Sequence, residues 1–313
     1  MSAPHAFSAA GGGRVLVTGA AGMLGSQLLL TAPRGVTAVG TDLVAAPGGN
    51  PDVARPGVDL SSAAAVERLL DELAPLVGVI HAAAYTAVDR AEEEEARAEL
   101  ANAEVPRLLA TACARRGIAL VHVSTDFVFD GTRRTPYGEG DAPHPLSAYG
   151  RTKLHGEEHV AAAHPRGAAI VRTQWLYGPR GRHFPGTILT LAAQKPELRV
   201  VDDQVGSPTS TLELAPALWD VLGARATGLF HAACEGQASW YDFAAATLAL
   251  CGKRTPIQPC STAEFPRPAH RPAYSVLDCA RLAALRGRPL APWREALSTF
   301  LAHEGLLAPA PTR

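Results

Sequence analysis

A glycine-rich turn near the start of the chain constrains the fold more than any other feature. The stretch VLVTGAAGMLG places glycines at three-residue spacing between a short apolar run and a segment with helical spacing. Glycine permits a tight turn and lets backbone N–H groups approach a pyrophosphate at the positive end of a helix. The alternative is a purely structural turn, which the strand before it, the helix after it and the acid that ends the next strand together disfavour. We predict that the turn binds a dinucleotide through Gly19, Gly22, Met23, Leu24 and Gly25.

Acidic residues after the next two loops extend this prediction. Asp42 ends the next apolar run, 23 residues after Gly19, where a carboxylate can accept hydrogen bonds from an adenosine ribose. A carboxylate there should repel a 2′-phosphate, so Asp42 favours NADH over NADPH. Asp59 and Leu60 are candidates for holding the adenine edge, and a solvated loop acid is the alternative for Asp59.

Strand and helix signals alternate through the first 180 residues. Apolar runs predict strands over residues 14–19, 36–43, 77–84, 118–125 and 168–178. Helical spacing covers residues 22–32, 61–74, 94–114 and 147–164, with a break or kink expected at Pro106. Alternation with continuous apolar strands predicts an α/β fold with a doubly wound parallel (Rossmann) sheet, whose ligands lie at the carboxyl ends of the strands.

The pattern loosens after residue 180. Helices are expected over 186–194, 211–223 and 239–251, and the five prolines of 255–273 predict irregular structure. A strand at 228–234 is expected to return to the main sheet. We therefore predict a flexible tail at 1–13, a dinucleotide-binding domain at 14–180 and a smaller, mainly substrate-binding lobe at 181–313.

Composition excludes several classes of function. The 313 residues carry a net charge of −1, so no nucleic-acid or membrane-surface partner is expected. From Gly181 onward, however, Lys and Arg outnumber Asp and Glu by 13 to 11, which allows an anionic ligand there. The five cysteines form no CxxC pair and are interpreted as reduced, mostly buried thiols; a catalytic cysteine is the alternative. No membrane span or signal peptide is recognisable, and we expect a cytoplasmic protein.

A tyrosine and a lysine four residues apart suggest acid–base chemistry. In Tyr149-Gly-Arg-Thr-Lys153 helical spacing puts the phenol and the ammonium on one face. A free phenol has a pKa near 10, and a neighbouring ammonium should lower it. The pair opens a helix just after a strand that ends in Ser124 and Thr125. That context favours a catalytic site over an exposed helix pair or a strand-end hydroxyl bonded to backbone.

These motifs together resemble an extended short-chain dehydrogenase/reductase. More narrowly, AAAYTAVDRAEEE, VHVSTDFVFDG, YGRTKLHGE, VRTQWLYG and VVDDQVGSPTSTLELA are similar to the dTDP-4-dehydrorhamnose reductase family, from about residue 14 to residue 300. The resemblance implies NAD(P)H-dependent reduction of the 4-keto group of a dTDP-4-dehydro-6-deoxyhexose. The partner it implies is a nucleotide sugar.

The resemblance also assigns roles to residues. Thr125, Tyr149 and Lys153 match the family triad: two hydroxyls against the ketone, with Tyr149 giving the proton and Lys153 holding the nicotinamide ribose. Further cofactor contacts are expected from the small residues Ala82, Ala83 and Ala84. Contacts to the sugar are expected from Ser124, Asp126, Phe127 and Trp175, although Trp175 and Phe127 are equally compatible with simple packing.

Departures from the family pattern lead to further expectations. Some members hold Mg²⁺ at a dimer interface through glutamates. At two of those positions this chain has Gln27 and Leu212, whose neutral side chains are poor ligands for Mg²⁺, so no metal is predicted. The adjacent residue Glu213 is the one observation against this prediction. A monomer or a homodimer without metal is expected. Phe127 stands where the family often has tyrosine, which leaves the sugar open.

Other functions remain as alternatives. A nucleotide-sugar dehydratase has an Asp-Glu pair after its threonine, and here Phe127 replaces the glutamate. The sequence argues less firmly against a nucleotide-sugar 4-epimerase on the same fold than against the dehydratase. A non-catalytic nucleotide-binding subunit is the third alternative, and the intact triad argues against it. The acidic run 92–95 is interpreted as a response to a helix dipole, because consecutive residues do not face one site.

Overall fold

The computed structural model describes residues 13–44 and 55–308, so the predicted tail lies almost wholly outside the described residues. A seven-stranded parallel sheet forms its centre, in the order β11-β6-β5-β4-β1-β2-β3. Its strands are β1 (Arg14–Thr18), β2 (Thr37–Asp42), β3 (Arg55–Pro56), β4 (Leu76–His81), β5 (Ala119–Thr125), β6 (Ala168–Thr173) and β11 (Gly228–His231). The strand order reverses between β1 and β4, which confirms the doubly wound sheet and marks where ligands bind in such folds.

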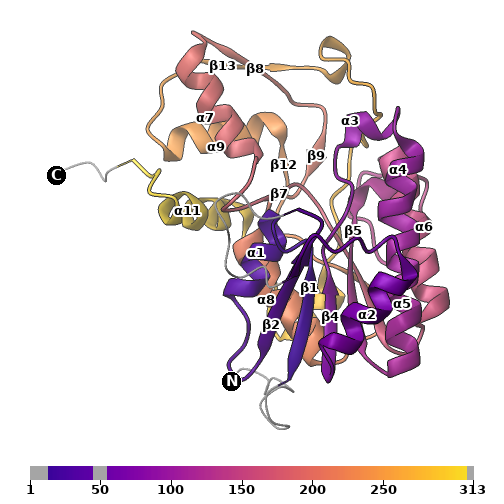
Figure 1. Cartoon of the computed structure of the whole chain (residues 1–313). Coiled ribbons are helices and arrows are strands. Elements are labelled where there is room, and N and C mark those ends of the chain that lie inside the picture. Colours follow the sequence, from indigo (N-terminus) through magenta and orange to yellow (C-terminus); the bar gives the residue numbers. More distant parts are fainter. Residues whose placement is uncertain (1–12, 45–54, 309–313) are drawn as a thin grey trace.

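Helices cover both faces of the sheet (Figure 1). The helices on one face are α1 (Met23–Leu30) and α8 (Thr211–Gly223), and those on the other are α2 (Ala63–Glu72), α5 (Val105–Arg116) and α6 (Ala148–Ala163). Successive side chains of a strand point to opposite faces. In β1, accordingly, Val15 and Val17 join the core under α1 and α8, and Leu16 joins the core under α2 and α5.

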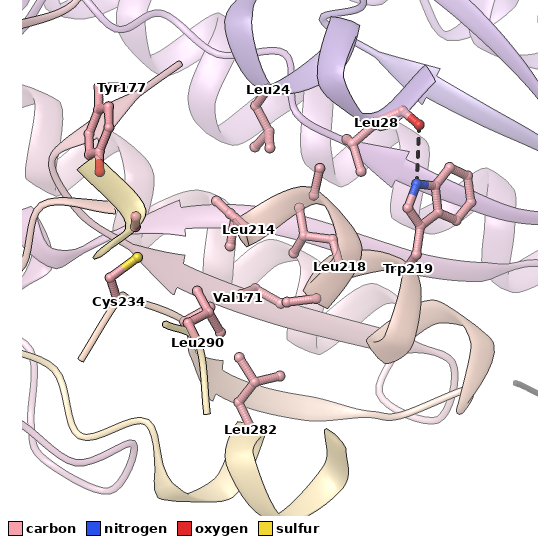
Figure 2. Close-up of a cluster of buried hydrophobic side chains, with 14 of the residues drawn as sticks. Leu24, Leu28, Val171, Tyr177, Leu214, Leu218, Trp219, Cys234, Leu282 and Leu290 are labelled. Atoms are coloured by element: carbon pink, nitrogen blue, oxygen red, sulfur yellow. Dashed lines mark hydrogen bonds between the residues drawn. The ribbon is translucent and has the colours of Figure 1, made fainter. Parts of the chain in front are cut away.

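The core beneath α1 and α8 joins the two halves of the chain. Leu24 and Leu28 of α1 lie near Leu214 and Leu218 of α8 (Figure 2), and the Trp219 indole N–H donates to the Leu28 carbonyl at 3.1 Å. The strand β11 also comes from the second half and pairs with β6 at the sheet edge. The division at residue 180 stays a prediction, since packing and sheet pairing both cross it.

Pro106 does not break its helix. The chain runs from α4 (Glu95–Glu99) through a π-helical turn (Leu100–Glu104) into α5, with Pro106 in the first turn of α5. Proline has no N–H to donate, and the wider turn ahead of it is where the hydrogen-bond pattern changes. Of the expected break or kink, the break is therefore wrong, and the structure has a π-helical irregularity just ahead of Pro106. The short helix α3 (Val88–Ala91) precedes this segment.

A smaller lobe stands above the carboxyl ends of the strands (Figure 1). It contains α7 (Phe184–Gln194), α9 (Trp240–Leu250), β8 (Leu198–Val201) and β13 (Ile257–Cys260). β13 pairs with β8 in parallel, so the prediction of irregular structure over 255–273 was wrong for this strand. Pro259 is accommodated because the sheet has only two strands and both are edges.

Short elements complete the described chain. They are β7 (Leu176–Tyr177) with β10 (Thr209–Ser210), β9 (Val205–Gly206) with β12 (Ala238–Ser239), and the helices α10 (Ala280–Arg286) and α11 (Trp293–His303). Sequence reasoning did not predict α10 or α11. In residues 13–44 and 55–308 no helix is both long and apolar enough for a membrane span. The cysteines are free thiols, four of them buried, as expected.

Candidate active site

A cavity of about 560 Å³ lies at the carboxyl edge of the sheet. The predicted residues that line it are Gly19, Gly22, Met23, Leu24, Gly25, Asp42, Ala82, Ala84, Ser124, Thr125, Asp126, Phe127, Tyr149, Lys153 and Trp175. Residues that the sequence did not single out also line it, among them Gln174, Trp240 and Arg271. The structure thus brings the glycine turn and the proposed triad into one space.

Two glycines of the turn, Gly19 and Gly25, leave no room for a side chain. Gly19 has a φ of +68°, and a Cβ there would lie 2.7 Å from the Ala83 nitrogen. A Cβ on Gly25 would lie 2.1 Å from the Gly19 carbonyl oxygen. The turn and the start of α1 therefore form a cradle of bare backbone, which fits the pyrophosphate of a nicotinamide dinucleotide.

The acids predicted to hold the adenosine differ in their surroundings. The Asp42 carboxylate lines the cavity and accepts the backbone N–H groups of Ala21 at 3.0 Å and Val44 at 3.2 Å. Asp59 instead accepts the Ser61 N–H at 2.9 Å, a bond that holds the pKa of this carboxyl below its ordinary value. Leu60 is buried in the core under α2 and α5. Asp59 and Leu60 do not line the cavity, and their adenine contact stays a prediction.

Two side chains fix the start of α6, the helix that carries Tyr149 and Lys153. The Ser147 hydroxyl accepts the Gly150 N–H at 3.2 Å, and the Glu92 carboxylate accepts the Ala148 N–H at 2.9 Å. From the sequence, Glu92 was expected only to respond to a helix dipole. In the structure it also caps the start of α6. Capping bonds of this kind satisfy N–H groups that have no partner within the helix.

The Tyr149 phenol is buried and neutral near pH 7. Burial raises its pKa to about 12, a hydrogen bond with Thr125 acts in the opposite direction, and the Asp126 charge adds to the rise. The predicted lowering by Lys153 is not seen, because the Lys153 ammonium reaches the Val123 carbonyl and donates to it at 2.7 Å. Burial lowers the pKa of Lys153 itself to about 8. A protonated phenol is the form that can give a proton to a developing alkoxide.

Asp126 and Phe127 flank the triad. The Thr125 hydroxyl donates to the Asp126 carboxylate at 3.0 Å, and burial raises the pKa of Asp126 to about 6 against hydrogen bonds from Ser275 and Thr125. The Phe127 ring meets the Tyr149 ring edge-on, with centroids 5.4 Å apart and an interplanar angle of 77°. Phe127 thus both packs on the proposed proton donor and forms part of the cavity wall.

The Ser124 hydroxyl has a partner inside the protein. It donates to the Glu157 carboxylate at 2.5 Å, and Glu157 is paired with Arg172 at 2.6 Å. Ser124 lines the cavity, yet its hydroxyl is bonded to Glu157, and its predicted contact with the sugar stays a prediction. Neither Glu157 nor Arg172 was singled out from the sequence, where each reads as an ordinary charged residue in a helix or strand.

A second cavity of about 590 Å³ adjoins the first. Trp240 and Arg271 line both, and Lys195, Arg199 and Arg267 add positive charge to the second. Asp89 and Glu197 also line it; Asp89 is paired with Arg271, and Arg199 is paired with Glu264. Four basic side chains against two acidic ones leave the lining with an excess of positive charge, which allows an anionic group there.

The wall between the cavities is aromatic and charged. The Trp175 and Trp240 rings stack with centroids 3.6 Å apart and 7° between their planes. Trp175 has a φ of +48°, a conformation that non-glycine residues rarely adopt, which often marks a functional site. Arg271 forms a two-bond pair with the Asp89 carboxylate, at 2.9 and 3.0 Å, and so joins α3 to the loop of the smaller lobe.

No group of His, Cys, Asp and Glu that could hold a metal ion occurs within residues 13–44 and 55–308. Gln27 is buried, Leu212 packs on the core, and the Glu213 carboxylate accepts the Ala291 N–H at 3.1 Å. A monomer, or a homodimer built without metal, stays a prediction.

Comparison with known proteins agrees with this geometry. Residues 13–305 match the family model described as the RmlD substrate binding domain. The chain is 43% identical over 296 residues to a dTDP-4-dehydrorhamnose reductase of Mycobacterium tuberculosis, with 92% of each chain covered. It is 44% identical over 290 residues to a probable dTDP-4,6-dihydroxy-2-methyloxan-3-one 4-ketoreductase of Streptomyces antibioticus, covering 91% of this chain and 93% of that one.

A solved structure is similar over the same span. The dTDP-4-dehydrorhamnose reductase of Bacillus anthracis, in complex with NADP, superimposes with a TM-score of 0.86 at 33% identity. The match covers 93% of this chain and 99% of that chain.

Proposed function

Because the chain belongs to the dTDP-4-dehydrorhamnose reductase family of extended short-chain dehydrogenases/reductases, we propose that it reduces the 4-keto group of a dTDP-4-dehydro-6-deoxyhexose with NAD(P)H. One observation carries the proposal beyond the family assignment. A single cavity joins the bare-backbone turn to Thr125, Tyr149 and Lys153.

Each residue of the cavity would have a separate role in the reduction of a ketone. A bound NAD(P)H supplies the hydride. The Tyr149 phenol would orient the ketone oxygen and give it a proton, and the Thr125 hydroxyl would join it by turning its O–H from Asp126 to the ketone. Lys153, which donates to the Val123 carbonyl and lines the same cavity, would hold the nicotinamide ribose. Trp175 and Phe127 would close the site around the sugar and keep water out.

The second cavity supports a nucleotide on the same substrate. Its cations suit the diphosphate that links a sugar to its nucleoside, and the shared Arg271 and Trp240 stand between that group and the triad. A substrate spanning both cavities would place its sugar beside Tyr149. The substrate is therefore proposed to bind across the boundary between the sheet and the smaller lobe.

Both nicotinamide dinucleotides remain cofactors in this proposal. The preference for NADH that Asp42 suggested has no support, because a relative is solved with NADP. The Asp42 carboxylate is also held by two loop N–H groups, which offset part of its charge. Repulsion of a 2′-phosphate is correspondingly weaker than the bare sequence implies.

The cavity argues against a dehydratase. Elimination of water needs an acid and a base beside the sugar, and the carboxylates lining the cavity are Asp42, on the cofactor side, and Asp126. Phe127 fills the position after Asp126 with an apolar ring. A reductase needs only the hydride, the phenol and the oriented ketone.

The test is a turnover assay on the purified full chain. We mix it with dTDP-4-dehydrorhamnose or dTDP-4-keto-6-deoxy-D-glucose and with NADPH or NADH, and follow cofactor absorbance and the product sugar. The proposal expects oxidation of at least one cofactor and a reduced C4 in the product. If no mixture consumes cofactor, the proposed activity is wrong.

A further inference from the structure

One buried carboxylate ties together three elements beneath the active site. Glu157 of α6 accepts the Ser124 hydroxyl of β5 at 2.5 Å and the Arg172 guanidinium of β6 at 2.9 Å (Nε) and 2.6 Å (Nη2). Their exposed fractions are 5% for Glu157 and 3% each for Ser124 and Arg172. The end of β5, which delivers Thr125, is thus anchored through its neighbour to the helix that delivers Tyr149 and Lys153.

Stability alone does not account for this arrangement. Burying two charges carries a desolvation penalty that their attraction often fails to offset, and apolar side chains of similar volume are commonly as stable. The remaining account is geometric: a carboxylate with fixed hydrogen bonds sets the distance between β5 and α6 more narrowly than apolar packing would.

The surroundings of Lys153 give the same carboxylate a second effect. The titratable groups around this lysine are Glu157 and Tyr149 on α6, His81 on β4 and His122 on β5, with Asp126 in the same cavity wall. Burial lowers the pKa of His81 to about 3 and that of His122 well below its usual value, so both rings are neutral. Glu157 is the group that counteracts the burial of Lys153 by favouring its charged form.

We propose that Glu157 is a positioning residue of the site: it holds Ser124, and with it Thr125, against α6, and its buried carboxylate, one helical turn from the buried Lys153, acts on that side chain. The catalytic importance of Glu157 rests on the reductase function proposed above. The effect of Glu157 on Lys153 does not depend on that function.

The effect on Lys153 can be measured without turnover. Lys153, Lys195 and Lys253 are the lysines of the chain, so protein labelled with ¹³C-lysine gives three ε-carbon signals, assigned with K195R and K253R. The wild-type Lys153 signal should titrate with a pKa of about 8. In Glu157→Gln the midpoint should fall by about one pH unit, because the variant loses the negative charge one helical turn away that favours the charged form of Lys153.

A matched control separates this effect from a general change of charge. Glu158→Gln alters the next residue of the same helix, which is exposed, and should leave the Lys153 titration unchanged. An unaltered midpoint in E157Q would overturn the effect on Lys153.

The positioning effect is tested by two milder variants, which also serve if E157Q does not fold. Ser124→Ala removes the tie to β5 and keeps the ion pair, so kcat should fall about tenfold with an unchanged KM for the cofactor. Glu157→Asp keeps the charge, so its Lys153 titration should remain close to wild type. Wild-type kcat in S124A would overturn the positioning role, and a fall in the midpoint in E157D would overturn the charge argument.

Failure of the proposed reduction would be seen separately. A wild-type protein that consumes no cofactor refutes the reductase function, whereas the lysine titrations still decide whether Glu157 keeps Lys153 charged. In an active protein, the alkaline limb of kcat against pH should move to lower pH in E157Q and stay in place in E158Q.

Discussion

Replacing Asp126 with asparagine should remove a pH-dependent loss of stability. Burial raises the pKa of this carboxyl from 3.8 to about 6 in the folded protein. The folded state therefore binds the proton more tightly than the unfolded state, and the group stabilises the fold fully below the unfolded pKa. That stabilisation is lost as pH rises through the folded pKa. The two pKa values correspond to about 3 kcal/mol in the free energy of unfolding, of which about 2 kcal/mol falls between about pH 4 and pH 7.5.

Urea unfolding of both proteins at these two pH values measures the effect. The amide of the Asp126→Asn variant cannot titrate, so the stability of D126N relative to wild type should rise by about 2 kcal/mol from the lower to the higher pH. The informative quantity is the change in this relative stability from one pH to the other. Any effect of the amide that does not depend on pH cancels in that change. The exposed control Glu158→Gln should show no such rise. An equal difference between wild type and D126N at both pH values would refute the claim that Asp126 is desolvated.

Three further substitutions test other parts of the structure. Gly25→Ala brings a Cβ to 2.1 Å from a carbonyl of the turn, so cofactor binding followed by nucleotide fluorescence should weaken at least about tenfold. Asp89→Ala frees Arg271 from its two-bond pair, and initial-rate kinetics should show KM for the nucleotide sugar rising about tenfold with KM for the cofactor unchanged. Leu218→Ala opens the fully buried core under α8 and should lower the free energy of unfolding by about 2 to 5 kcal/mol in urea titrations, whereas Leu306→Ala, at a position that is 40% exposed, should change it by less than about 1 kcal/mol.

Sequence reasoning succeeded where local chemistry and position in the fold agree. The glycine turn needs a strand before it and a helix after it, and both are readable from apolar spacing. Because the carboxyl ends of parallel strands share one edge, strand order along the chain was enough to place Thr125, Asp42, Ala82 and Ala84 in one cavity; Ala83 does not line it. Tyr149 and Lys153 share a helix face by spacing alone.

The parts that could not be predicted depend on long-range contacts. Lys153 binds a strand carbonyl rather than lowering the Tyr149 pKa, which no helical spacing reveals. Arg271 comes from a proline-rich segment 182 residues after its partner Asp89, and nothing local in either stretch marks the pair. The strand β13 is likewise formed by pairing with β8 and not by its own propensity.

The central claim is that the neutral Tyr149 phenol donates the proton in a ketone reduction, and Tyr149→Phe tests it most directly. The purified variant and wild type are compared in kcat with the nucleotide-sugar substrate and in affinity for the cofactor. Tyr85→Phe serves as the control, because that hydroxyl donates to Glu94 at 2.9 Å and Tyr85 does not line the cavity. The account predicts a fall in kcat of at least about 100-fold with unchanged cofactor affinity in Y149F and wild-type kinetics in Y85F. Wild-type kcat in Y149F would contradict it.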